Sequence, residues 1–166
     1  MTNPPPWLRG PVAGVPALLQ PVAHSLIDCA EDVRSRVAGL SIDAIWTRPA
    51  TAASIGFHVR HAIGSLDRLL TYARGEMLDA AQLAVLKTEG IRESGPATAD
   101  ELIAAFDTSV ERAMDQLRAT READLLVTRE VGRAKLPSTV IGLLFHAAEH
   151  TQRHMGQMST TIKVVT

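Results

Sequence analysis

The chain has 166 residues, of which 46% are hydrophobic and 21% charged, and its net charge is −1. This composition is typical of one soluble globular domain with a proper core, and it excludes a disordered chain. The balanced charge predicts no attraction to nucleic acid or to an acidic membrane surface, and no apolar run approaches the roughly 18 residues that a membrane span needs.

Two features bear on the cellular compartment. The only cysteine, Cys29, excludes an internal disulfide and falls on a helical core pattern, where it is most simply a small buried apolar residue. The N-terminus, Met-Thr-Asn-Pro-Pro-Pro-Trp, lacks the charged and apolar regions of a secretory signal. We therefore expect a cytoplasmic protein.

Residues 1–16 are rich in proline and glycine, so they cannot form a long helix. We interpret them as an irregular arm, and we expect Trp7 and Leu8 to anchor this arm on the body of the protein. Residues 17–166 show no internal repeat and no linker. They are predicted to form a single domain.

The first half of this domain contains two helical patterns. Apolar residues recur at threes and fours over 17–40, and this spacing predicts an amphipathic helix. Residues 41–49 form a connection with one large apolar residue, Trp46. A second helix is predicted over 51–74, with Gly75 as its C-terminal stop.

The second half contains two more long helical patterns. A short helix over 79–87 precedes a third long helix over 98–119, which opens with a capping-box arrangement. Residues 120–136 are expected to form a polar loop with a short β-branched piece around 126–131. The last helix is predicted over 137–161. Four long amphipathic helices without an alternating strand pattern predict an all-α fold, a four-helix bundle.

Three of the six histidines lie in the last predicted helix, at positions 146, 150 and 154. Residues four apart in a helix point in directions about 40° apart, so His150 and His154 share one face. Apolar residues fall at helical spacings near the same side: Ile141, Leu144, Phe145, Ala148, Met155 and Met158. We expect this face to be turned partly into the protein, where each imidazole needs a partner or a metal ion.

A second histidine cluster lies in the second predicted helix, where His58 and His61 share a face at a spacing of three. A catalytic zinc-type site usually takes about three protein ligands and keeps one position open, so one of these two histidines would complete the pair on the last helix. Spacing alone does not choose between them. Asp28, Asp32 and Asp67 are candidate acceptors for a ligand imidazole, or simply solvated helix charges.

Other metal architectures do not fit. A di-iron carboxylate bundle needs Glu-x-x-His pairs, whereas Glu149 is followed three residues later by Gln152. A zincin helix needs His-Glu-x-x-His, whereas the glutamate here precedes the first histidine of the pair.

Two segments together resemble the DinB-like (YfiT-like) superfamily: Ser54-Ile-Gly-Phe-His58-Val-Arg-His61, and His150-Thr-Gln-Arg-His154-Met-Gly156-Gln157. The resemblance implies an up-down-down-up four-helix bundle that is usually dimeric. It also implies a divalent metal, zinc or nickel, held by one histidine of the second helix and two of the last. Carried over, the ligands are His61, His150 and His154.

The resemblance further implies an S-transferase or an isomerase in which the metal activates a low-molecular-weight thiol. An open metal position also allows a hydrolase in which the metal activates water, and the substrate in either case is a small molecule. His58 and His146 are then additional, as a fourth ligand or as proton-transfer groups. Arg153 is either a solvated charge or a handle for an anionic cofactor or substrate. The alternative is a non-catalytic bundle that binds a metal or ligand, or serves only for homodimerisation.

Overall fold

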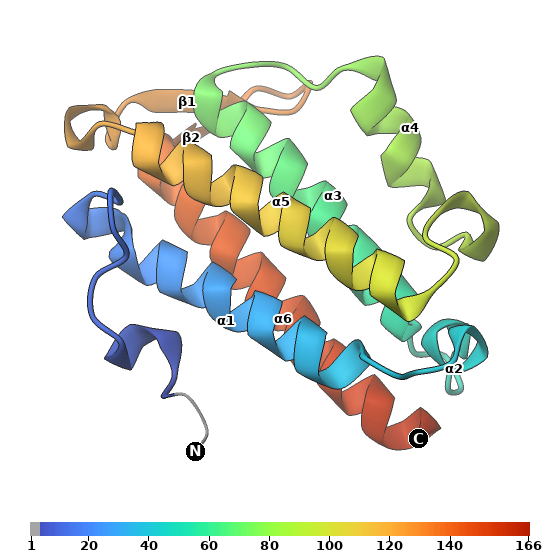
Figure 1. Cartoon of the computed structure of the whole chain (residues 1–166). Helices are drawn as coiled ribbons and strands as arrows, with labels where there is room; N and C mark the ends of the chain where they lie inside the picture. The colour runs from blue at the N-terminus through green and yellow to red at the C-terminus, as the bar shows by residue number, and fades with distance from the viewer. Residues whose placement is uncertain (1–3) are drawn as a thin grey trace.

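The computed structural model describes residues 4–166, which are mostly helical and carry one small two-stranded sheet (Figure 1). The bounds of the long helices are α1 Gln20–Val37, α3 Ile55–Arg74, α5 Ala99–Ala119 and α6 Val140–Val165. Shorter elements connect them: α2 Ile42–Trp46, α4 Ala80–Thr88, β1 Thr128–Val131, β2 Leu136–Thr139, and the 3-10 turns Pro6–Leu8, Ala17–Leu19, Arg92–Ser94 and Glu122–Asp124.

The long helices pack side by side around one apolar core. The most extensive contact is between α3 and α6, and α1 and α5 cover the other sides of this pair. The core is filled mainly by aliphatic residues and methionine, as the low aromatic content predicts, with Phe106 as its largest fully buried side chain. No helix within residues 4–166 is long and apolar enough to span a bilayer.

Capping side chains decide where the two central helices begin. Ser54 accepts a hydrogen bond from the backbone N–H of Phe57, so α3 starts at Ile55 and not near Thr51 as predicted. Thr139 caps α6 in the same way, through the N–H of Gly142. At the other end of α3, Gly75 adopts φ 84°, a left-handed conformation that glycine takes at low cost.

The expected polar loop over 120–136 is partly wrong, because residues 128–139 form a hairpin. Strand β1 pairs antiparallel with β2, and Thr128 lies opposite Thr139. Pro137 and Ser138, predicted to open the last helix, lie in β2 instead. Each strand has only four residues, and none of them is fully buried, so the alternating pattern is too short to recognise.

The prediction that Trp7 and Leu8 anchor the N-terminal segment is wrong, since they are 66% and 57% exposed. Pro6 is the buried residue of this turn. Polar contacts hold the segment against α1: Nη2 of Arg9 lies 2.7 Å from a carboxylate oxygen of Glu31. The apolar character of a side chain therefore did not decide its burial here.

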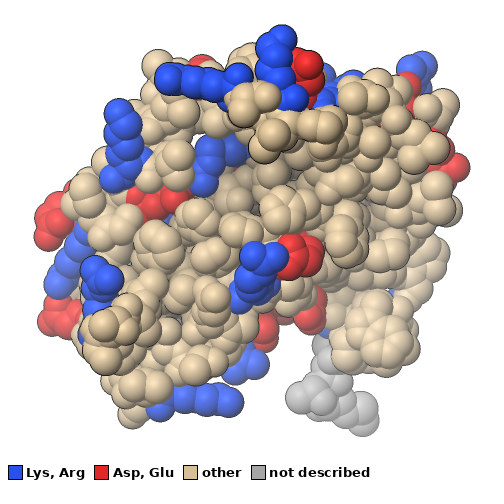
Figure 2. Space-filling view, turned by 180° about the vertical axis from the view of Figure 1, so that it is seen from behind, with Lys and Arg blue, Asp and Glu red and all other residues tan. Residues whose placement is uncertain are grey.

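Charged residues do not gather into one field. Figure 2 shows basic and acidic side chains interspersed over one face, with broad uncharged areas between them. Several neighbours of opposite sign are paired, among them Arg34 with Asp107 and Arg121 with Asp124. This distribution agrees with the net charge of −1.

Candidate metal centre

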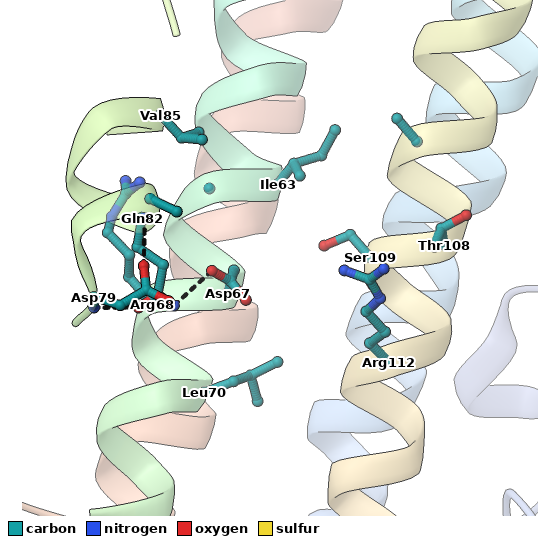
Figure 3. A pocket seen from close by; sticks show the side chains of 13 residues that line it. Ile63, Asp67, Arg68, Leu70, Asp79, Gln82, Val85, Thr108, Ser109 and Arg112 are labelled. Carbon is teal, nitrogen blue, oxygen red and sulfur yellow. Dashed lines mark hydrogen bonds between the residues drawn. The ribbon is translucent and has the colours of Figure 1, made fainter. Parts of the chain in front are cut away.

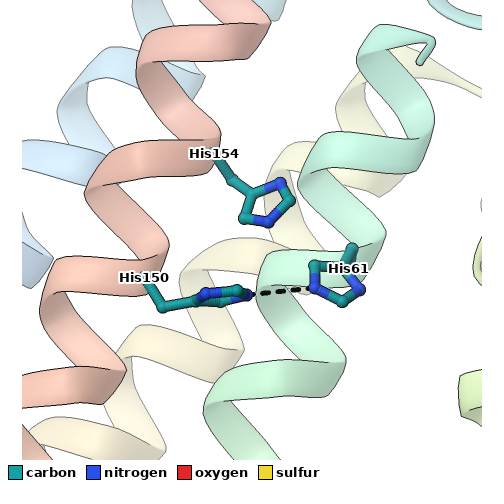
Figure 4. A group of neighbouring side chains, drawn as sticks. All are labelled: His61, His150 and His154. Atoms are coloured by element: carbon teal, nitrogen blue, oxygen red, sulfur yellow. Dashed lines mark hydrogen bonds between the residues drawn. The ribbon is translucent and has the colours of Figure 1, made fainter. Parts of the chain in front are cut away.

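Three imidazoles from two helices meet where α3 packs on α6. His61 comes from α3, and His150 and His154 come from α6, with their rings directed toward one another (Figure 4). One ring nitrogen of each lies within 4.8 Å of the others. Nε2 of His61 is 3.0 Å from Nε2 of His150. A tetrahedral zinc ion with Zn–N bonds of about 2.0 to 2.1 Å holds two nitrogens roughly 3.3 Å apart, so His61 and His150 would need only a small shift to share one ion.

The local sequence explains why these rings are neither free in solvent nor fully enclosed. Small and apolar residues on both sides of His150, Ala147 and Thr151, are buried against the other helices, while His150 itself is half-buried. His154 follows one helical turn later and precedes the buried Met155. The histidine pair thus lies at the edge of the buried stripe of α6, where a ligand from solvent can still reach it.

Glu89 lies behind His61 and is the most important site residue that the sequence did not reveal. It is only 2% exposed. Its Oε2 lies 2.7 Å from Nδ1 of His61, and its Oε1 lies 2.6 Å from Nη1 of Arg68. Burial alone would raise the pKa of Glu89, but the hydrogen bonds from His61 and Arg68 outweigh it, so the pKa lies below its ordinary value. The carboxylate is therefore ionised.

This contact determines the tautomer of His61. An ionised carboxylate only accepts hydrogen bonds, so Nδ1 of His61 must carry the proton that it donates to Glu89. In the neutral ring, Nε2 is then unprotonated and faces His150 and His154. A histidine whose other nitrogen is held by a carboxylate is the usual arrangement of a metal ligand.

Gly64 provides the space for this carboxylate. It lies in the middle of α3, between His61 and Arg68, where glycine costs about 1 kcal/mol relative to alanine. A Cβ at this position would collide with Oε1 of Glu89 and approach Nη1 of Arg68 to 2.7 Å. The absent side chain is what allows a residue from the end of α4 to reach the helix surface beside His61.

His58 is 5% exposed and supports His154. The Nδ1 atoms of the two rings are 3.0 Å apart, so one ring donates a hydrogen bond to the other. His154 can offer Nε2 to a metal only if its own Nδ1 carries the proton, and His58 must then accept it. The structure thus places His58 as the partner that orients His154.

The electrostatic surroundings favour neutral imidazoles. Burial is the main cause that lowers the pKa of His58 and of His150, and in both cases the nearby His61 adds to the effect. For His154, burial and the neighbouring imidazoles lower the pKa to about 4. Neutral imidazole is the form that binds a metal ion, and no proton has to be displaced from His150 or His154 at neutral pH.

Comparison with known proteins shows the family of this chain. The model of the DinB superfamily matches residues 25–158, a span that contains all three histidines. The chain belongs to the DinB superfamily. No curated protein matches the sequence.

Two solved structures share the fold. A conserved protein from Enterococcus faecalis superposes with a TM-score of 0.67 at 20% sequence identity, over 89% of this chain and 96% of that one. A DinB-like protein from Bacillus cereus ATCC 10987 gives 0.65 at 13% identity, over 86% and 89%. Membership of the DinB superfamily, predicted from the two histidine segments, is confirmed.

Two further predicted site residues of this DinB-superfamily chain lie at the rim, outside the cluster of three. The side chain of His146 is 51% exposed, and its Nδ1 lies 3.2 Å from Glu149. Arg153 is also exposed and pairs with Glu149, with Nε 3.1 Å from Oε1. The hydrogen bond from Arg153 is the main reason why the pKa of Glu149 is lowered. The pairing occupies Arg153, so a role toward an anionic ligand stays a prediction.

The aspartates considered as acceptors for a ligand imidazole make other contacts. Asp67 accepts from Gln82 and Asp28 from Gln152, while Asp32 pairs with Arg36. Phe145, expected on the inner side of the last helix, is 61% exposed. The one sequence signal for Glu89 was indirect: Arg68 lies two turns from His61 on the same buried stripe, and a buried guanidinium requires an acidic partner.

A separate pocket of about 310 Å³ lies between α3, α4 and α5 (Figure 3). Asp67 and Gln82 face it from one side, and Ser109 and Arg112 from the other. Arg68 lines this pocket and also contacts Glu89, but none of the clustered histidines does. The pocket therefore lies behind the metal centre and does not open onto it.

Proposed function

We propose that this protein is a metal-dependent enzyme in which His61, His150 and His154 hold a divalent ion, zinc or nickel, that activates water or a low-molecular-weight thiol. The observation that carries the proposal is the convergence of three imidazole nitrogens, with a buried carboxylate fixing the first. Three protein ligands with an open position are typical of catalytic sites, whereas structural sites are usually closed by a fourth. We also propose that the four long helices form an up-down-down-up bundle and that the protein is a homodimer.

A bound divalent ion lowers the pKa of a coordinated water or thiol and so supplies a nucleophile at neutral pH. The residues of the chain orient the ligand imidazoles and exchange protons. Glu89 holds His61 in the tautomer that exposes Nε2, and His58 does the same for His154. In this proposal His146 exchanges protons with solvent, which its exposure at the rim one turn before His150 supports.

One observation favours a second function without metal. His61 and His150 are close enough to hydrogen-bond directly, as are His58 and His154. A cluster satisfied in this way would leave a non-catalytic bundle that binds a ligand or only dimerises. It predicts that chelators change neither stability nor ligand binding.

The deciding experiment is metal content per chain, measured by elemental analysis on protein made without a polyhistidine tag. We expect close to one zinc or nickel per chain in the wild type and a loss of that metal in His154→Ala. His24→Ala is the matched control, because His24 lies on α1 and its Nε2 contacts the backbone oxygen of Gly10, away from the cluster. Absence of metal from the wild type, even after incubation with zinc and nickel, would overturn the proposal.

Activity assays then show whether the metal centre activates water or a thiol. The metal-loaded wild type and His154→Ala are assayed for hydrolysis of p-nitrophenyl acetate and for conjugation of added thiols to 1-chloro-2,4-dinitrobenzene. We expect one of these reactions to depend on His154. Equal rates in both proteins would leave a metal site without catalysis.

A further inference from the structure

A groove of about 630 Å³ runs along the outside of the metal centre. One wall is the segment before α3, including Pro49 and Ala53, and the other is the last two turns of α6, including Thr160 and Val164. Ala50 shapes the first wall with φ 51°, a conformation that costs a residue other than glycine about 1 to 2 kcal/mol. The volume is typical of sites for small organic ligands, which range over about 300 to 1,000 Å³.

The inner end of the groove touches the metal ligands through two adjacent residues of α3. The ring of Phe57 stacks on that of His61, with centroids 5.3 Å apart and an angle of 14° between the planes. His58 follows it and lies within hydrogen-bond distance of His154. Both Phe57 and His58 line the groove. A molecule in the groove therefore lies one side chain away from His61 and from His154.

The lining carries no charged side chain. Its surface is mainly apolar, and its polar members are His58, Gln157 and two threonines. The threonine hydroxyls are already engaged with backbone oxygens: Thr160 donates to Gly156, and Thr161 to Ala53. A charged ligand would lose hydration here without gaining an ionic partner, and such a loss is unfavourable.

We propose that this groove binds the apolar body of an uncharged small-molecule substrate against Phe57 and His58, one side chain away from the metal ligands. The proposal rests on the proposed function, because it names the substrate class of the same site. We choose an uncharged ligand because the lining of the groove is uncharged. The concave shape beside the histidines favours a small molecule over a second protein chain.

The test uses two fluorescent probes with the same ring system. N-phenyl-1-naphthylamine is uncharged, and 8-anilinonaphthalene-1-sulfonate adds one negative charge. Both are titrated into chelator-treated protein, so that binding does not depend on metal. We expect the uncharged probe to bind once per chain, and the sulfonate to bind at least about tenfold more weakly, which corresponds to about 1.4 kcal/mol.

Filling the groove should abolish this binding. Thr160→Trp places an indole in it, and we expect at least about a tenfold loss of affinity for the uncharged probe. Thr108→Trp is the matched control: Thr108 is also an exposed helical threonine whose hydroxyl donates four residues back, but it lies on α5 and lines the separate pocket between α3, α4 and α5, not the groove. Ala52→Leu, at a second exposed lining residue, repeats the test should Thr160→Trp not fold.

Equal probe affinity in Thr160→Trp and Thr108→Trp, or equally tight binding of the sulfonate, would overturn the proposal. So would a wild type that sediments as a dimer and binds no probe while Thr160→Trp is monomeric, because a second copy would then cover the groove. Metal analysis of the same preparations before chelator treatment, and after incubation with zinc or nickel, separates the two proposals. Probe binding by protein that never takes up metal would retain the groove and refute the metal enzyme, and the reverse result would refute the groove alone.

Discussion

The contact between α3 and α6 and the segment around α4 are built in opposite ways. On α3 and α6, apolar stripes bury most of the inner side chains, and the histidines lie at the edge of those stripes. On α4 no side chain is buried, and Leu83, Val85 and Leu86 are exposed. Yet the residue directly after α4, Glu89, is among the most deeply buried polar residues of the described chain. A loosely packed segment thus supplies the charge that the well-packed pair of helices needs.

The comparison shows that the packing of the helix pair and the support of the metal site depend on different kinds of contact. The helix pair is held by many apolar contacts, each of modest strength, and no single one of them is indispensable. The α4 segment depends on a few polar contacts at defined atoms, from Gln82 to Asp67 and from Glu89 to Arg68 and His61. Removing one of these contacts should therefore have a larger effect than its small area implies.

Glu89→Ala is the strongest way to break the link between the two regions. It leaves Arg68 buried without its acidic partner, and removing one member of a buried ion pair typically costs about 3 to 5 kcal/mol. It also frees Nδ1 of His61, and losing such a supporting contact lowers metal affinity about 10- to 100-fold. Urea unfolding measures the first effect, and competition with a chromophoric zinc chelator measures the second.

Glu93→Ala is the control, since Glu93 is an exposed glutamate in the same segment. We expect it to change stability by less than about 0.5 kcal/mol. A Glu89→Ala protein with the stability and zinc affinity of Glu93→Ala would show that Glu89 has no role in fixing His61.

Gly64→Ala tests whether the space for Glu89 matters more than helix propensity. Alanine is about 1 kcal/mol better than glycine within a helix, so propensity alone predicts a gain. The added Cβ would instead displace the carboxylate from Arg68, and overpacking of this kind costs about 1 to 3 kcal/mol. We expect a net loss of stability in urea unfolding, together with weaker zinc binding.

Gly156→Ala on α6 is the matched comparison, because a Cβ there meets nothing within 4 Å. Propensity should act alone at this position and stabilise the protein by up to about 1 kcal/mol. Two stabilising substitutions would mean that Glu89 tolerates displacement, which would contradict the role assigned to Gly64.

The same contrast explains what the sequence could predict. Helical periodicity was sufficient to find α1, α3, α5 and α6, although the predicted first residues of α3 and α6 were wrong, and the spacing of His150 and His154 predicted their common face. The choice of His61 over His58 came from the family resemblance, and the structure shows why spacing was indifferent: both rings contact the histidines of α6. Glu89 lies 28 residues from His61 along the chain, and no local pattern encodes a contact that depends on how α4 folds back.

The pH dependence of the metal-free protein concerns the helix pair alone. In the folded chain the pKa of His154 falls from its ordinary value of 6.5 to about 4, and burial lowers the pKa of His58 and His150 as well. Between these limits the unfolded chain binds more protons than the folded one, so stability must rise with pH. The histidine contribution is complete above about pH 6.5 and is lost progressively as the pH falls toward about 4.

Urea midpoints at pH 5 and pH 7 in the presence of a chelator measure this slope, and the range lies above the ordinary pKa of 4.5 for Glu89, whose titration would otherwise contribute. His154→Gln removes the most shifted group and should flatten the slope more than Glu89→Gln, which lies on the α4 side and should mainly lower both midpoints. A slope that depends on Glu89 and not on His154 would place the pH-sensitive group in the α4 segment. The pH dependence of stability would then come from the α4 segment, and not from the buried histidines of α3 and α6.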